Sequence, residues 1–286
     1  MKEPVLVGYR LLRTSAPKTW NFGFVGAWQK MKMSLGTLYG ARWLMTLLLI
    51  RLSLQGGGLD DVSLDEPEGG GLGFPSIYSE VIWESRYVSE GRDYLEGGGS
   101  ITGFMSIGYD GAALDTSFRE GIDPKYSELN IGPSYEYAFE DFVASAYYYH
   151  LRFLREDLND HEVGVGLVYS GLPWDLKISL DSYYSFLWEG TFSLLALSTD
   201  WQISERLSLQ PRAIFGINSG YVPDAHEGPN HLALRLDADY HLFGNIFFTG
   251  YLAQNWEIGR EPYERRPGDY PLTDFLWGGL GVMVTF

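Results

Sequence analysis

Apolar and polar residues alternate along many stretches of this chain, and this period of two constrains its fold more than any other feature. The clearest stretch is 231–242. One face carries Leu232, Leu234, Leu236, Ala238, Tyr240 and Leu242, and the other carries His231, Ala233, Arg235, Asp237, Asp239 and His241. Residues 174–186 repeat the pattern. Such alternation predicts β-strands with one covered face, because helical patterns repeat about every 3.6 residues instead.

About twelve such stretches follow one another along the chain and predict an all-β fold. They are 77–90, 99–109, 112–119, 126–138, 141–153, 161–171, 174–187, 191–203, 206–217, 230–242, 245–257 and 274–286. Tight connectors such as Asp110-Gly111 alternate with longer ones such as 154–160. We therefore predict an antiparallel barrel of about 12 strands, with short turns at one rim and longer loops at the other. Pro133 and Pro211 lack a ladder donor, so we expect bulges there.

The alternation alone does not tell whether the apolar face points inward or outward. Twelve strands enclose a space too wide for Leu and Val side chains to fill, since about eight strands is the packed limit. Aromatic residues make up 16% of the chain. Several, such as Trp174 and Trp201, fall near predicted strand ends, as in the aromatic girdles of membrane barrels. We therefore expect a transmembrane β-barrel with short periplasmic turns and longer extracellular loops.

The last predicted strand, Asp274–Phe286, has an almost continuous apolar face. Its residues are Leu276, Gly278, Leu280, Val282, Val284 and Phe286. A strand of this kind that ends on an aromatic residue resembles the C-terminal assembly signal of bacterial outer-membrane barrels. The resemblance implies that Phe286 is an assembly signal, that the barrel-assembly machinery is a partner, and that the protein meets lipid and lipopolysaccharide in the bacterial outer membrane.

The first quarter of the chain has a different character from the alternating stretches. Residues 1–30 show no periodic pattern, and we interpret them as a mis-annotated leader. Residues 31–56 combine basic residues with the short apolar run 43–50, which is typical of a signal peptide. Residues 57–75 form a Gly-rich acidic linker with too little apolar area to fold. The barrel is expected to span 76–286.

If the apolar face meets lipid, the charged face lines the lumen. The predicted lumen-lining residues are Glu80, Glu84, Arg86, Glu90, Glu128, Glu136, Arg152, Asp175, Lys177, Asp181, Asp200, Arg212, Arg235, Asp237 and Asp239. Acids outnumber bases, so a pore through this barrel should favour cations. We predict a narrow, weakly cation-preferring diffusion pore for small solutes or ions. The same charges could instead form cross-strand ion pairs that only stiffen a watery lumen.

Composition excludes several other functions. A formal net charge of −16 argues against nucleic acid as a partner, and the absence of Cys excludes disulfides and Cys-ligated metals. The sequence contains no Gly-rich phosphate loop, zinc spacing or calcium-loop motif. We therefore expect no cofactor, no metal site and no enzyme activity.

Short motifs in the first half of the predicted barrel resemble a known family. The run Glu84–Asp93, ESRYVSEGRD, ends a strand in Gly before a polar loop, and the Gly-rich stretch from Glu96 to Gly108 follows it. Tyr126–Asn130, YSELN, opens a strand after a loop. These features resemble the TorF-type porins. The resemblance covers about 77–286 and implies a small Gram-negative outer-membrane barrel with a pore role, without catalytic residues.

Two alternatives to an open pore remain. One is a structural or adhesive barrel that conducts nothing because loop 258–273 or paired charges plug the lumen. The other is an outer-membrane hydrolase. It would use Asp157, Asp160 and His161 in one predicted loop together with Asp224 and His226 in another, since acid and His pairs can activate water.

Overall fold

A computed structural model describes residues 75–122, 126–222, 227–258 and 272–286. The predicted leader, signal peptide and nearly all of the linker lie outside these residues. The strands are β1 (Ser76–Glu84), β2 (Val88–Ser89), β3 (Arg92–Asp93), β4 (Ser100–Tyr109), β5 (Ala112–Gly121), β6 (Ser127–Phe139), β7 (Phe142–Phe153), β8 (Leu158–Tyr169), β9 (Leu176–Ser185), β10 (Gly190–Thr199), β11 (Trp201–Gln202), β12 (Leu207–Ser219), β13 (Gly228–Phe243), β14 (Ile246–Glu257) and β15 (Phe275–Thr285). A short 3-10 turn, η1, spans Pro173–Asp175. Within the described residues, no helix is long and apolar enough to cross a membrane.

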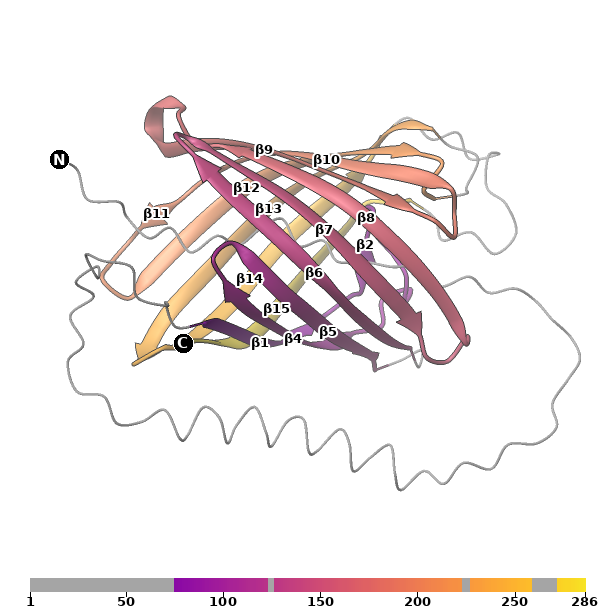
Figure 1. Ribbon diagram of the computed structural model, residues 1–286, viewed down its shortest axis with the longest axis horizontal. Helices are drawn as coiled ribbons and strands as arrows, with labels where there is room; N and C mark the ends of the chain where they lie inside the picture. Colours follow the sequence, from indigo (N-terminus) through magenta and orange to yellow (C-terminus); the bar gives the residue numbers. More distant parts are fainter. Residues whose placement is uncertain (1–74, 123–125, 223–226, 259–271) are drawn as a thin grey trace, which may run out of the picture.

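The long strands form one closed antiparallel barrel, which confirms the predicted fold class. Each strand pairs with its sequence neighbours, and β1 pairs with both β4 and β15. A direct pairing of β10 with β12 closes the ring, while the two-residue β11 only extends the sheet beyond β10. The barrel therefore has 12 strands. Figure 1 shows them tilted across the molecule and wrapped around a common interior.

The seam between the first and last strands depends on close backbone contact. The register of β1 with β15 runs from Tyr78↔Thr285 to Glu84↔Gly279. Phe286 continues the ladder, because it exchanges backbone hydrogen bonds of 2.9 and 2.8 Å with Ile77. A Cβ at Gly281 would lie 2.5 Å from a carbonyl oxygen of β1, so only glycine allows this approach. The C-terminus therefore lies beside the start of β1 (Figure 1).

Apolar side chains cover the outside of the barrel. Leu234, Leu252 and Leu280 are 49%, 57% and 53% exposed, while their neighbours in sequence point inward. The side chains of Val81 and Trp83 on β1 also point outward. A soluble protein rarely exposes a continuous apolar band of this kind. The alternation in 231–242 and 274–286 thus places the oily face outside.

The two rims differ in their connections, as predicted. Asp110 and Gly111 have φ values of 50° and 77° and join β4 to β5 in a tight turn. This conformation favours Asp-Gly and matches the twist of a two-residue hairpin. The turns after β6 and β13 are equally short, and all three lie at the rim that also holds both barrel ends. We call this the short-turn rim, and the opposite one the long-loop rim.

Three expectations about local structure were wrong. The first strand ends at Glu84 instead of residue 90, and β8 begins at Leu158, so the connector 154–157 is shorter than predicted. The register stays constant through Pro133 and Pro211, whose rings lie on the outward face. Pro211 sits opposite the interruption between β10 and β11, where no ladder donor is required. The observed shift on β12 lies at Gly216/Ile217.

Candidate pore lumen

A hairpin formed by residues 85–98 folds into the barrel instead of continuing its wall. Its two short strands, β2 and β3, meet at Glu90 and Gly91, whose φ values are 44° and 71°. Positive φ at both central residues is the signature of a type I′ turn. Tyr87, Arg92 and the segment between them are buried, except for the partly buried Val88. We call this segment, 85–98, the inner hairpin.

Hydrogen bonds hold the tip of the inner hairpin against the far wall. Arg92 Nη1 donates to the backbone oxygen of Glu90 at 3.1 Å and to Asn230 Oδ1 at 3.0 Å. Asn230 Nδ2 donates to the same oxygen of Glu90 at 2.7 Å. The hydroxyl of Tyr183 on β9 donates to Glu90 Oε1 at 3.0 Å. Because β1 and β9 are separated by five barrel strands in either direction, the hairpin crosses the whole lumen.

A second segment enters the same half of the lumen after β12. Tyr221 and Val222 are buried, and Asn218 holds Val222 through two hydrogen bonds of 2.9 Å with its backbone. The Tyr221 hydroxyl donates to Glu162 on β8. Burial raises the pKa of Tyr221 well above its ordinary value, so the hydroxyl stays protonated as a donor. Inward apolar side chains pack around this segment: Tyr183, Phe192, Leu194, Ala196, Ile214, Ala233, Tyr251, Ala253, Phe275 and Trp277.

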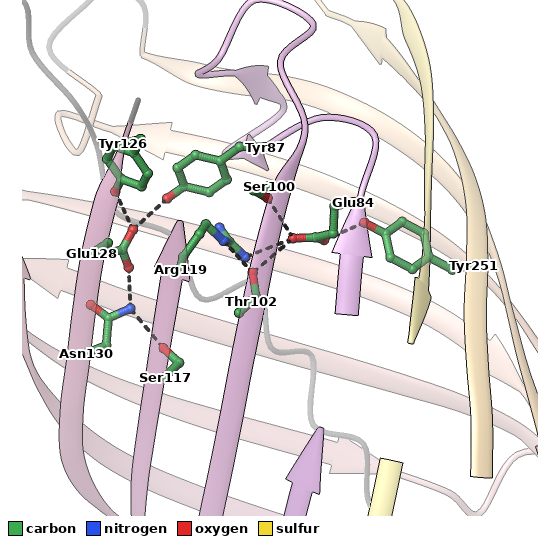
Figure 2. A network of polar contacts seen from close by, with 10 residues as sticks. All are labelled: Glu84, Tyr87, Ser100, Thr102, Ser117, Arg119, Tyr126, Glu128, Asn130 and Tyr251. Carbon is green, nitrogen blue, oxygen red and sulfur yellow. Dashed lines mark hydrogen bonds and ion pairs between the residues drawn. The ribbon is translucent and has the colours of Figure 1, made fainter. Parts of the chain in front are cut away.

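A belt of charged and aromatic side chains spans the lumen below the inner hairpin. Figure 2 shows Glu84 between Arg119 and Tyr251. Arg119 Nη2 donates to Glu84 Oε2 at 3.2 Å, and its Nε donates to Thr102 Oγ1 at 2.8 Å. The Tyr251 hydroxyl donates to Glu84 Oε1 at 2.5 Å. These charge-assisted bonds link β5, β1 and β14, no two of which are neighbours in the sheet.

One end of the belt continues into the inner hairpin. The Arg119 guanidinium lies over the Tyr87 ring, 4.1 Å from its centroid. The hydroxyls of Tyr87 and Tyr126 both donate to Glu128, as does the Asn130 amide (Figure 2). Burial raises the pKa of the Tyr87 hydroxyl, which therefore remains a donor to the carboxylate. The hairpin and the wall are thus joined through shared polar partners.

The other end of the belt is a buried triad on β12 and β13. Asp237 accepts from Arg212 Nη2 at 2.5 Å on one oxygen and from Arg235 Nη2 at 2.7 Å on the other. Asp237 is 2% exposed. The Arg235 guanidinium also lies over the Tyr251 ring at 3.7 Å, a cation–π contact that connects the triad to Glu84. The belt therefore reaches from β6 to β12 across the lumen.

Below the belt the lumen is open. A cavity of about 840 Å³ extends from the belt to the short-turn rim, where Asp110 and Phe286 form part of its mouth. We call it the vestibule. Its charged lining away from the mouth consists of Glu80, Glu84, Glu136, Asp239, Arg119, Arg212 and Arg235. Acidic groups outnumber basic ones in this wall, and the vestibule is where a solute from the short-turn side would first meet fixed charge.

Most of the expected lumen residues lie on the inner face of the barrel. These are Glu80, Glu84, Glu128, Glu136, Lys177, Asp181, Arg212, Arg235, Asp237 and Asp239. Arg86 and Glu90 are also inside, but on the inner hairpin, where Arg86 Nη1 lies 2.5 Å from Asp93 Oδ2.

Three expected residues are placed differently. Arg152 points outward with 53% of its side chain exposed, because Leu151 and Phe153 take the inward parity of β7. Asp175 belongs to the exposed 3-10 turn, since β9 starts only at Leu176. Asp200 lies in the break between β10 and β11 at the short-turn rim, where it pairs with Lys177.

Sequence reasoning missed several interior charges: Asp115, Arg119, Asp160 and Glu162. The signal for Arg119 was present, because Leu114, Thr116 and Phe118 alternate with Asp115, Ser117 and Arg119. Applying the same period of two to 112–121 would have placed Arg119 in the lumen. No comparable signal marked Asn230, whose role depends on a hairpin from the other end of the chain.

The predicted hydrolase site is not assembled in the described part of the chain. Asp160 and His161 belong to β8 and point to opposite faces, with Asp160 buried inside and His161 exposed outside. Asp224 and His226 lie outside the described residues. Across the ranges that the structure describes, no three His, Cys, Asp or Glu side chains gather closely enough to hold a metal ion.

Comparisons with known proteins give structural matches only. No family model matches the sequence, and no curated protein matches it. Among solved structures, the KdgM porin has a TM-score of 0.48 and 12% identity, over 74% of this chain and 99% of that one. The NanC porin gives 0.49 and 10%, over 72% and 98%. The COG4313 outer membrane channel from Pseudomonas putida F1 gives 0.45 and 10%, over 78% and 100%. These neighbours are porin-like outer-membrane barrels, while the likeness to TorF-type porins stays a prediction.

Proposed function

We propose that this protein is an outer-membrane β-barrel that acts as a narrow, weakly cation-preferring diffusion channel for small ions or solutes. The observation that carries the proposal is a polar interior enclosed by an apolar exterior. The vestibule holds fixed charges, whereas outward residues such as Leu234 and Leu252 expose apolar surface. A closed barrel satisfies its backbone hydrogen bonds internally, as spanning a bilayer requires.

The proposed channel is narrow because the inner hairpin occupies the long-loop half of the lumen. Tyr87 and Arg92 are fully buried there, and Tyr221 fills the space beside them. Solutes would have to pass between these side chains and the wall. Only small ions or solutes fit such a route, which distinguishes the proposal from a wide general pore.

The proposed cation preference rests on the excess of carboxylates inside. Glu80, Glu136 and Asp239 line the vestibule, and the three arginines there are each engaged by acidic or aromatic partners in the belt. Net negative charge within low-dielectric walls raises the local cation concentration. The preference should weaken at high salt, because the screening length falls to about 3 Å at 1 M.

A second candidate is a barrel that conducts nothing and serves a structural or adhesive role. The buried contacts of the inner hairpin favour it, since a fully fixed Arg92 leaves little room for a path. The plug would then be residues 85–98 and 221–222 instead of the expected loop 258–273, of which residues 259–271 lie outside the described part.

Reversal potentials in planar bilayers test the proposed selectivity. Folded protein is added to a membrane that separates two KCl concentrations, and the zero-current voltage is measured at low and high total salt. We expect a zero-current voltage whose sign shows that K⁺ passes more easily than Cl⁻. Its magnitude should decrease as the total salt concentration rises. Anion preference would contradict the charge assignment. Complete absence of channels at high protein load would favour the structural barrel.

A further inference from the structure

Polar side chains gather on the outside of the barrel near the long-loop rim. Tyr148, His150 and Arg152 point outward from β7, and His161 points outward from the adjacent part of β8. On β7 these side chains alternate with Leu151 and Phe153, which are buried inside the barrel. We call these four residues the outer His–Arg patch.

The patch is compact and partly organised by its own contacts. His150 and His161 face each other across the two strands, with ring centroids 4.9 Å apart. The Tyr148 hydroxyl lies 2.6 Å from His161 Nδ1. If the hydroxyl donates this bond, the neutral imidazole carries its proton on Nε2, which can then donate to a ligand. Tyr148 therefore fixes the orientation of His161.

Arg152 is available for a further partner. Its nearest acidic group is Asp157, at 3.9 Å, and the Asp157 side chain is 91% exposed. An exposed pair at this distance contributes little stability. By contrast, Arg155 on the neighbouring loop is engaged by Glu120 at 3.0 Å. The other described Lys and Arg side chains lie inside the barrel or at the short-turn rim: Arg86, Arg92, Arg119, Lys177, Arg206, Arg212 and Arg235.

The position of the patch suggests its partner. Below it on β8, the outward residues are Val163, Val165 and Leu167, which are all exposed and apolar. The patch begins where this apolar face ends. In the proposed membrane setting, this is the level of the lipid headgroups, where Arg and His side chains can meet anionic groups at little cost.

We propose that the outer His–Arg patch binds the phosphate of a membrane lipid headgroup. The Arg152 guanidinium offers a planar fork that matches phosphate oxygens, and the two imidazoles add donors on the adjacent strand. The acyl chains of the lipid would lie along Val163, Val165 and Leu167. The proposal rests on the membrane setting of the proposed function, although it does not require that the barrel conducts.

Native mass spectrometry of the detergent-folded full chain tests the proposal. The probes are phosphatidic acid and diacylglycerol with the same acyl chains, which differ only in the phosphate. The patch variant is Arg152→Ala with His161→Ala, and the control variant is Arg206→Ala with His241→Ala, which removes the same residue types at the other rim. Folding of each variant is checked by its heat-modifiable migration on a gel.

The wild type and the control should retain phosphatidic acid, and the patch variant should bind it about tenfold more weakly or worse. Equal retention by the two variants, or equal retention of diacylglycerol, would overturn the proposal. Displacement by an equimolar amount of inorganic phosphate would instead identify a free-anion site. A wild type that fails to fold in detergent would overturn the membrane setting itself, whereas normal lipid binding without conductance would overturn only the channel.

Discussion

The two halves of the lumen are built from the same twelve-stranded wall, but they differ in what fills them. The long-loop half contains the inner hairpin and Tyr221, and several of its buried polar groups bond to one another, as Tyr183 does to Glu90 and Tyr221 to Glu162. The short-turn half is an open vestibule of about 840 Å³ whose charges face water. The same alternation of residues thus produces a packed interior in one half and a solvated one in the other.

This difference separates two properties of the proposed channel. Resistance to flow should be set in the long-loop half, where side chains occupy the path. Ion preference should be set in the vestibule, where carboxylates such as Glu80 and Glu136 remain accessible. Stability should depend mainly on the belt, which contains the mostly buried Glu84 and Arg119 and the buried pair Arg212–Asp237, because buried charges are costly once they lose a partner.

Removing the inner hairpin should have the largest effect. Replacement of residues 87–95 by a short Gly-Ser linker is expected to raise single-channel conductance several-fold, since of the two segments that fill the long-loop half only residues 221–222 would remain. The measurement is the step size in planar bilayers. Replacement of the exposed loop 154–157 at the same rim is the matched control and should leave step size unchanged. Unchanged conductance in the hairpin variant would mean that the two halves do not differ in resistance.

Arg119→Ala should strongly destabilise the folded barrel. It leaves the Glu84 carboxylate, which is only 15% exposed, without its cationic partner, and breaking a fully buried pair costs about 3–5 kcal/mol, so the loss here should approach the lower end of that range. Lys177→Ala, which removes the partly exposed pair with Asp200 near the short-turn rim, should cost only about 0–1 kcal/mol. Urea midpoints of folding into detergent or lipid measure both effects. Similar decreases of the urea midpoint in the two variants would contradict the distinction between the mostly buried belt and the solvated short-turn rim.

Neutralising the vestibule should change ion preference without changing stability much. Glu80→Gln combined with Glu136→Gln is expected to lower the cation preference, because both carboxylates line the open cavity. Glu90→Gln removes a carboxylate from the filled half, where Tyr183 and Tyr94 hold it, and should leave the reversal potential nearly unchanged. A larger shift of the reversal potential in Glu90→Gln than in the double variant would show that charges in the long-loop half, and not in the vestibule, set the ion preference.

The period of two was sufficient to predict the wall of the barrel. Stretches such as 231–242 have one apolar and one charged face, and a strand is the only regular structure that separates them. The inner hairpin was missed because alternation continues beyond Glu84, with Glu84 and Arg86 on one face and Trp83 and Tyr87 on the other. Gly91 was the available clue, since Gly readily adopts the positive φ that a tight hairpin turn requires.

The interior was harder to predict than the wall. On β7, both faces carry aromatic or small residues, so the position of Arg152 could not be derived from its charge alone. Apolar side chains such as Phe192 and Leu194 point into the lumen because the inner hairpin and Tyr221 give them something to pack against. Contacts between segments this distant in sequence leave no periodic signal.

Single-channel recording of the folded wild-type protein in planar bilayers shows whether the barrel conducts. We expect discrete, small conductance steps in KCl, because the proposed path narrows where the inner hairpin fills the long-loop half before it opens into the vestibule. Recordings that show no steps at high protein load, from protein whose folding is verified by heat-modifiable migration, would contradict the channel and leave a closed structural barrel.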